Sequence, residues 1–354
     1  MMSLVLAATI WSFAVVSPGH AAPSSWQSQI PGAATEDGAL RAGWDRLNRG
    51  EYEAAAAAFR QAIEQTPDLA VGYFGLGLSL ANLHQYREAA ECFTRATSLR
   101  PDLVAGHLNL GLAHRQLGDH RAALEAFAQA ARVAPQDPRA RLQLGLTLNV
   151  LGRYNDAVAS FTESIRLAPD ATAYLGLGIA RGSVGQYAAA IDALTHAVTL
   201  DPNLVEAQLT LGTTYGNIDR WPDAVASLQR ATALSPKNRD AHYSLAKSLV
   251  RLGRLEEAVE EYRETVRLRP NDSAAHYHLG LTFVDLHRTM DAAAAFAEAV
   301  RQRPDYAPAI FNLALAYHAL GKTADAWAQH RALAAVDANL ARQLESLLGK
   351  KPGS

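Results

Sequence analysis

Histidine and cysteine are the residue types in this chain that could bind a metal ion or attack a substrate. The chain has 354 residues, with twelve histidines and a single cysteine, Cys92. One cysteine excludes an intrachain disulfide framework and a cysteine-rich zinc site. The sequence contains no His-Glu-x-x-His motif, no Ser/His/Asp arrangement and no Gly-x-Ser-x-Gly motif. We therefore expect no catalytic residue, no metal site and no cofactor, and we do not expect an enzyme.

Three of the histidines occupy equivalent places in the sequence. His107, His242 and His276 stand at one position of a unit that recurs about every 34 residues. A shared position indicates a shared structural role. His276 and His278 are two residues apart, so on a helix they point to different faces and cannot easily bind one metal ion.

A glycine-rich segment at residues 176–182 (GLGIARG) superficially resembles a nucleotide-binding loop. Such a loop must follow a strand and open a helix. Gly178 instead recurs at the spacing of the repeating unit, inside a predicted helix. We interpret it as a glycine that lets two helices pack closely.

The spacing of the prolines reveals the elements that must position all these residues. Eight prolines recur at intervals of 34 residues, or 33 in one case: Pro67, Pro101, Pro135, Pro169, Pro202, Pro236, Pro270 and Pro304. Glycine, alanine and aromatic or leucine residues recur in register with them. Proline ends a helix because it has no amide hydrogen. Each unit therefore predicts two short helices, which are marginal alone in water and must stack on their neighbours.

The turn between the two helices of a unit carries its own signal. Several units place a glycine there, where a left-handed backbone is expected. These glycines are Gly118, Gly152, Gly185, Gly253 and Gly321.

The full pattern of one unit resembles the tetratricopeptide repeat family. It reads Tyr73, Leu76, Gly77, Leu80, Tyr86, Ala89, Phe93, Ala96 and Pro101. The resemblance implies an all-α fold, a right-handed α-solenoid (superhelix) of nine helix–turn–helix units with a C-terminal capping helix. The predicted units are 36–69, 70–103, 104–137, 138–170, 171–204, 205–238, 239–272, 273–306 and 307–340, followed by a capping helix at 341–349 and a tail at 350–354.

The N-terminal segment is predicted to be a signal peptide. Leu4 to Val16 is an apolar run of thirteen residues, too short to span a membrane, and Gly19 to Ala21 suits a cleavage site. We assign 1–22 to this segment and 23–35 to a linker, and we expect an exported protein, periplasmic or secreted. The alternative is an uncleaved segment that anchors the chain, because no Lys or Arg precedes the apolar run.

The candidate binding residues follow from the predicted register. In a solenoid of this family, the first helices line a concave groove, which they expose through positions 2, 5, 6, 9, 12 and 13 of each unit. Amides there can bond the backbone of an extended peptide, and aromatic rings can anchor its side chains. The candidates are Asn109, Arg115, Gln116, Arg139, Gln143, Asn149, Tyr243, Ser244, Lys247, Arg251, Tyr277, His278, Phe311 and Asn312. The alternative is that positions 5 and 9 only pack neighbouring helices together.

The charge balance limits the partners. Lys and Arg total 33 against 35 Asp and Glu, a formal charge of −2, which does not favour sequence-independent nucleic-acid binding. We expect a non-enzymatic scaffold that binds a protein or peptide in the concave groove. A self-assembling structural protein and a regulatory subunit of an envelope enzyme, such as a glycosyltransferase, remain as alternatives. The sequence does not identify the partner, and self-association stays possible.

Overall fold

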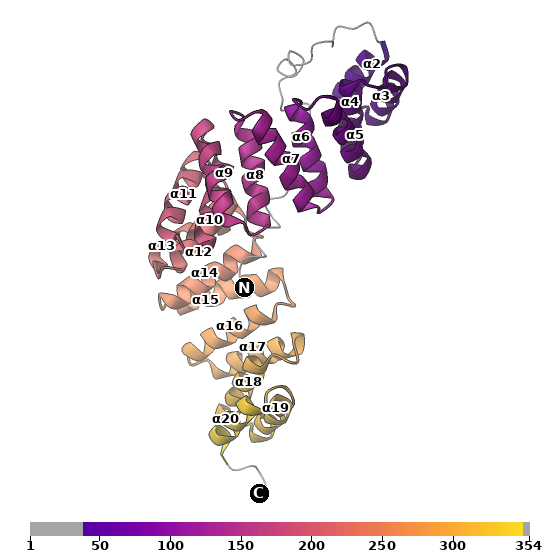
Figure 1. Cartoon of the computed structure of the whole chain (residues 1–354). Coiled ribbons are helices and arrows are strands. Elements are labelled where there is room, and N and C mark those ends of the chain that lie inside the picture. Colours follow the sequence, from indigo (N-terminus) through magenta and orange to yellow (C-terminus); the bar gives the residue numbers. More distant parts are fainter. Residues whose placement is uncertain (1–37, 350–354) are drawn as a thin grey trace. The chain divides into compact units, whose positions relative to one another are not determined.

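Every regular element that the computed structural model describes, across residues 38–349, is an α-helix (Figure 1). The helices form nine successive pairs and one final helix, which confirms the predicted all-α fold of stacked helix pairs. The predicted signal segment, the linker and the tail lie outside the described residues. Within 38–349, none of the helices has the length and hydropathy that crossing a membrane requires.

The first helix of each pair is called an A helix and the second a B helix. The A helices are α2 (Gly38–Asn48), α4 (Ala70–Asn82), α6 (Val104–Gln116), α8 (Pro138–Val150), α10 (Ala171–Ser183), α12 (Val205–Gly216), α14 (Arg239–Arg251), α16 (Ser273–Asp285) and α18 (Ala307–Ala319). The B helices are α3 (Tyr52–Gln65), α5 (Tyr86–Leu99), α7 (His120–Val133), α9 (Tyr154–Leu167), α11 (Tyr187–Leu200), α13 (Trp221–Leu234), α15 (Leu255–Leu268), α17 (Thr289–Gln302) and α19 (Thr323–Val336). The final helix is α20 (Ala338–Leu348).

The described chain divides after Pro202 into two compact units. Unit 1 contains α2 to α11, and unit 2 contains α12 to α20. Each unit has its own core and is described by itself.

The core of unit 1 repeats one contact between an A helix and its B helix. The Phe93 and Phe127 side chains are fully buried. Each ring lies against a glycine of the preceding A helix, and a Cβ atom at Gly77 or Gly111 would lie 2.6 Å from the ring. Glycine is therefore required there because no side chain fits between the helix and the ring.

The segment that resembled a nucleotide-binding loop follows the same rule. Gly176, Gly178 and Gly182 all lie inside helix α10. A Cβ atom at Gly178 would lie 2.5 Å from the Leu194 side chain. This confirms the interpretation of Gly178 as a packing glycine.

Unit 2 uses the same contact and then closes its end with α20. A Cβ atom at Gly280 would lie 2.5 Å from the buried Phe296 ring. Leu344 and Leu348 of α20 pack into the last apolar cluster with Trp327. Helix α20 begins at Ala338, three residues before the predicted start, because Asp337 accepts hydrogen bonds from the first backbone amides.

The turns between A and B helices have the predicted left-handed backbone. The five glycines expected there have φ values between 72° and 78°. Three other pairs place a non-glycine residue at the same position: His84 (φ 60°), Asp219 (φ 58°) and His287 (φ 57°). The geometry of the turn is therefore kept even where the side chain is unfavourable for it.

Candidate binding surface of the A helices

The candidate residues of unit 1 lie on α6 and α8 and are called the polar zone: Asn109, Arg115, Gln116, Arg139, Gln143 and Asn149. Its central side chains connect neighbouring A helices. Arg115 Nη1 donates to Gln143 Oε1 at 2.6 Å, from α6 to α8. Asn149 Nδ2 donates to the carbonyl oxygen of Gly176 at 3.0 Å, from α8 to α10. In each case a side chain at position 12 of one repeat bonds a group at position 6 of the next.

Two side chains of the polar zone are buried, although the register predicted exposed positions. Asn109 is 7% exposed and Arg115 is 9% exposed. Asn109 Nδ2 donates to the carbonyl of Ala105 on its own helix at 2.9 Å, and Arg115 extends toward the neighbouring repeat. Burial lowers the pKa of the Arg115 guanidinium. Both side chains are therefore already hydrogen-bonded to other groups of the protein.

Arg139 is exposed, but its guanidinium is already paired within the protein. Its guanidinium forms a two-pronged ion pair with Asp137, with Nη2 to Oδ2 at 2.7 Å and Nε to Oδ1 at 3.0 Å. Asp137 also caps helix α8 through the backbone amide of Arg139. The pair therefore has a local structural role at the start of the helix.

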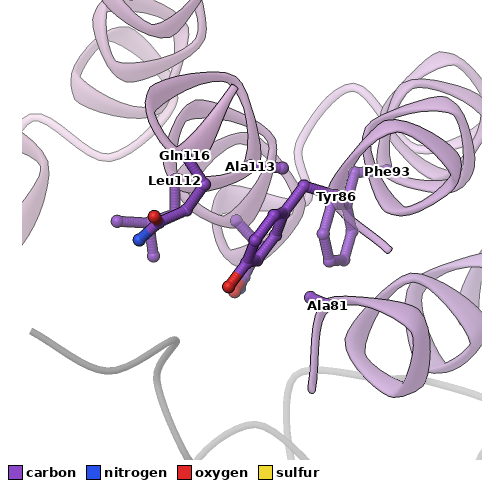
Figure 2. Close-up of a pocket in the computed structure, with 7 residues that line it drawn as sticks. Ala81, Tyr86, Phe93, Leu112, Ala113 and Gln116 are labelled. Atoms are coloured by element: carbon purple, nitrogen blue, oxygen red, sulfur yellow. The ribbon is translucent and has the colours of Figure 1, made fainter. Parts of the chain in front are cut away.

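A small pocket lies between the polar zone and the repeat before it. Figure 2 shows Tyr86 and Phe93 of α5 facing Leu112, Ala113 and Gln116 of α6. Its cavity volume is about 10 Å³, room for one water molecule. It cannot admit a ligand side chain.

A wider hollow lies elsewhere on α5 and α6, outside the candidate positions. Its volume is about 420 Å³, and Arg87, Glu91, Arg95, His114 and Leu117 are among the residues that line it. Arg95 is already paired with the carboxylate of Asp68 at 2.9 Å. The other two charged residues named here, Arg87 and Glu91, carry opposite charges, so they give the hollow no net charge.

The candidate residues of unit 2 lie on α14, α16 and α18 and are called the aromatic zone: Tyr243, Ser244, Lys247, Arg251, Tyr277, His278, Phe311 and Asn312. Its centre is a cluster of rings. The His278 ring stacks on Tyr262 with 6.1 Å between centroids and 11° between planes. The Tyr243 and Tyr277 rings each form an edge-to-face contact with the same imidazole, with 5.8 Å and 5.5 Å between ring centroids. Three helices, α14, α15 and α16, thus meet at His278.

Tyr277 extends the ring cluster toward the next repeat. Its ring lies 5.2 Å from that of Tyr306 and 5.8 Å from that of Phe296. The Arg303 guanidinium lies 3.7 Å from the Tyr306 ring centroid, a cation–π contact. Asn312 Nδ2 lies 3.5 Å from Tyr277 Oη and donates to the Pro308 carbonyl at 2.9 Å.

Three of the four remaining members of the aromatic zone, Ser244, Arg251 and Phe311, have different surroundings. Ser244 is half-buried, and its carbonyl accepts a hydrogen bond from Ser248 Oγ at 2.9 Å. Arg251 lies 5.0 Å from the Trp221 ring and 3.6 Å from the Asp219 carboxylate. Phe311 packs against the last apolar cluster.

Lys247 differs from Arg251 of the aromatic zone and from Arg239, which lies beside the zone at the start of α14. Its side chain is exposed and forms no ion pair with any residue of the described range 38–349. Arg239, by contrast, is paired with both Asp240 and Asp272 and covers one face of Tyr243 at 4.7 Å. Lys247 is therefore the cation of this zone that has no ion-pair partner among residues 38–349.

The pKa values reflect the burial of the ring cluster. Burial lowers the pKa of His278 below its ordinary value, the nearby Lys247 ammonium lowers it further, and Asp272 acts in the opposite direction. Burial raises the pKa of Tyr243 and, more strongly, that of Tyr262. His278 is neutral at pH 7, so the zone carries the positive charge of Lys247 beside a neutral imidazole.

The three equivalent histidines share the structural role predicted for them. Nε2 of His107, of His242 and of His276 each lies 3.0 Å from a proline carbonyl six residues earlier. Each imidazole is thus hydrogen-bonded to the turn before its A helix. Among the described residues, no three His, Cys, Asp or Glu side chains gather as metal ligands would.

Cys92 lies half-buried on helix α5. Burial is the main cause that raises its pKa to about 11. Its thiol is therefore protonated at neutral pH and unreactive.

Sequence reasoning missed three residues of the ring cluster. Tyr262 lies on a B helix, Tyr306 is the last residue of the predicted unit 273–306, and Arg239 is the first residue of the predicted unit 239–272 and of helix α14. None of the three stands at a position that the register predicted to be exposed in the groove. Tyr262 did carry a signal: it places a tyrosine where most repeats have phenylalanine or leucine.

Comparison with known proteins supports the repeat architecture. Residues 103–307 match the family model described as the Cilia and flagella-associated protein 70 C-terminal domain, which covers more than half of the chain. Three tetratricopeptide repeat models match residues 46–84, 70–103 and 277–339. No curated protein matches the chain.

Two solved structures with TM-scores above 0.5 share the fold at low identity. The hetero-tetramer Cut9–Hcn1 of the APC/C has 18% identity and a TM-score of 0.53, over 82% of this chain and 57% of that chain. A tetratricopeptide repeat protein from Parabacteroides merdae ATCC 43184 has 17% identity and a TM-score of 0.51, over 69% and 97%. MamA has 26% identity and a TM-score of 0.43, over 46% and 95%.

Proposed function

Because the chain belongs to the tetratricopeptide repeat family, we propose that it is a non-enzymatic scaffold that binds a protein or peptide segment in a groove lined by its A helices. Solenoids of stacked repeats provide extended surfaces for such binding. The observation that carries the proposal is the aromatic zone of unit 2. It combines half-buried rings with an exposed lysine that has no ion-pair partner within residues 38–349.

The aromatic zone has the features of a binding surface. Tyrosine and arginine are enriched among the residues that dominate binding energy, and a rigid aromatic side chain loses little entropy on binding. Tyr243 and Tyr277 are already fixed by ring contacts with Tyr262, His278 and Tyr306. They are therefore preorganised for a ligand side chain.

The test is partner capture with a matched control. The full chain is used to recover partners by cross-linking and pull-down, and each recovered protein is quantified by mass spectrometry. The double variant Tyr277→Ala with Arg251→Ala should reduce recovery of a specific partner about tenfold or more, because it removes two anchors. The control double variant Arg267→Ala with Met290→Ala changes exposed residues of B helices in the same unit and should not reduce recovery.

Two further measurements complete the test. Circular dichroism should show equal helicity for both double variants, so that a lost partner reflects a lost contact. If recovery is the same with both variants, the groove is not the binding site. Light scattering at high protein concentration then distinguishes a self-assembling protein, which would give oligomers, from a monomer.

We also propose that the chain is exported and that its first 22 residues are a signal peptide. The support is the apolar run of thirteen residues followed by the small residues Ala21 and Ala22. N-terminal sequencing of the protein isolated from its cells should give a chain that starts near Ala22 or Pro23. A chain that retains Met1 and is found in membranes would show an anchor in its place.

A further inference from the structure

Lys247 occupies a particular place within the aromatic zone. On helix α14 it lies three and four residues after Ser244 and Tyr243 and four before Arg251, so all four share one side of the helix. Arg251 is held by Asp219 and by the Trp221 ring. The Lys247 ammonium thus stands beside the ring cluster with no anion bound, as far as residues 38–349 show.

The neighbouring rings supply the apolar half of a subsite. Tyr243, Tyr277 and His278 come together from α14 and α16, with centroid separations of 5.5 to 5.8 Å around the imidazole. All three are half-buried, so each still presents surface to a ligand. A cation beside half-buried rings is complementary to an anion next to an apolar side chain.

We propose that the aromatic zone recognises an extended segment that carries an Asp or Glu side chain next to an aromatic or branched apolar side chain. Lys247 binds the carboxylate, and the rings of Tyr243, Tyr277 and His278 receive the apolar side chain. This inference rests on the proposed function and specifies its ligand.

The subsite also couples binding to a proton. The charged and titratable groups around His278 are Lys247 and Tyr243 on α14, Tyr262 on α15, Tyr277 on its own helix α16, and Asp272 in the turn before it. A carboxylate held by Lys247 brings a negative charge close to the imidazole and stabilises its protonated form. Binding should therefore be accompanied by the uptake of a proton on His278. Affinity should rise as the pH falls below the ordinary pKa of histidine, about 6.5, as long as the ligand carboxylate stays ionised.

The experiment begins with a random decapeptide library displayed on phage. Selection uses the full chain, and sequences that also bind the Tyr277→Ala with Arg251→Ala variant are removed. The selected peptides should share an Asp or Glu next to an aromatic or branched apolar residue. The strongest are synthesised, together with copies in which that Asp or Glu is replaced by Asn or Gln.

Binding of these peptides is then measured by fluorescence anisotropy. Lys247→Gln should weaken the acidic peptides about tenfold, the loss expected for one charge-assisted hydrogen bond. Lys237→Gln is the matched control, because it removes the same charge from an exposed lysine in the turn before α14 and should change affinity less than twofold. The Asn or Gln peptides should bind the wild-type chain about as weakly as the acidic peptides bind Lys247→Gln.

The pH series tests the role of the imidazole. The acidic peptides should bind wild type more tightly at pH 5.5 than at pH 7.5, and His278→Gln should remove that difference. The peptides with Asn or Gln in place of the acidic residue should bind with equal affinity at the two pH values, both to wild type and to His278→Gln.

The outcomes separate the two proposals. Selected peptides without a shared acidic residue, or with equal affinity for wild type and Lys247→Gln, overturn the acidic subsite and leave the groove as a binding surface. A library that yields no sequence dependent on Tyr277 and Arg251 overturns the proposed binding surface itself.

Discussion

The polar zone of unit 1 and the aromatic zone of unit 2 share positions 6 and 13 of the repeat and use position 6 differently. In the polar zone, Arg115 and Asn149 at position 12 bond groups at position 6 of the following repeat. In the aromatic zone, position 12 of the seventh repeat is Val250, which has no donor for His278 at position 6. His278 therefore packs among tyrosines, and Lys247 nearby has no ion-pair partner among residues 38–349. The residue at position 12 of one repeat thus decides whether position 6 of the next repeat receives a hydrogen bond from it.

The largest predicted effect tests the scaffold that both zones share. Gly111→Leu and Gly280→Leu should each destabilise the local pair by about 3 kcal/mol, because the new side chain would enter the space of Phe127 or Phe296. Hydrogen exchange resolved by repeat measures the local loss, since stacked repeats need not unfold together. Gly182→Ala is the control, because its Cβ would meet only Ala190 at 3.8 Å. A loss confined to one unit would show that the two scaffolds differ.

The second prediction tests the difference between the zones directly. Arg115→Ala should cost about 2 kcal/mol of stability, because a buried charged hydrogen bond to Gln143 is lost. Lys247→Ala should change stability by less than about 0.5 kcal/mol, as expected for an exposed side chain. Urea unfolding followed by circular dichroism compares the two. Equal losses would contradict the assignment of one zone to structure and the other to binding.

The third prediction concerns the turns that present each zone. Gly118→Ala should cost about 1 kcal/mol, because its φ of 77° strains any residue with a side chain. His287→Ala at φ 57° should cost less than about 0.5 kcal/mol, because a side chain already bears that strain in the wild-type chain. Thermal unfolding of both variants gives the comparison. A larger cost at His287 would indicate an additional contact of its imidazole.

The smallest effect is a change in how stability depends on pH. It compares His242, which is hydrogen-bonded to a carboxylate, with His278, which packs among aromatic rings. The hydrogen bond to Glu261 at 2.6 Å raises the pKa of His242, so its contribution is complete below the unfolded value near 6.5 and is lost as the pH rises through the folded value. Burial lowers the pKa of His278, so its contribution is lost as the pH falls below 6.5 toward the folded value. His242→Gln and His278→Gln should therefore change the slope of unfolding free energy against pH in opposite directions between pH 5 and 8. Urea unfolding at several pH values measures the slope for each variant and for wild type, and changes of slope in the same direction would contradict the two environments.

Much of the fold could be predicted from the sequence because the repeat is local. Proline spacing located the turns, and the glycines before the B helices have the left-handed backbone expected of them. The shared position of His107, His242 and His276 correctly indicated one structural contact. All of these depend on residues within one repeat, so one period of the pattern is enough to predict them.

The candidate surface could be predicted only in part. The register placed Asn109 and Arg115 at exposed positions, and the structure buries both. Their burial depends on the helix beside them and on the length of the arginine side chain, which can reach Gln143 in the following repeat. Tyr306 was missed because its position belongs to the turn in the register, although its ring packs on Tyr277.

The sequence by itself therefore determined the repeating unit: two short helices, the small residues between them and the turns that join them. A period that recurs nine times leaves little freedom in these features, since each helix can bury its apolar side only against its neighbours. The tertiary structure alone decided which polar side chains are already bonded and which remain free. That choice depends on distances between side chains of adjacent repeats, such as Arg115 to Gln143, which no spacing along the chain contains.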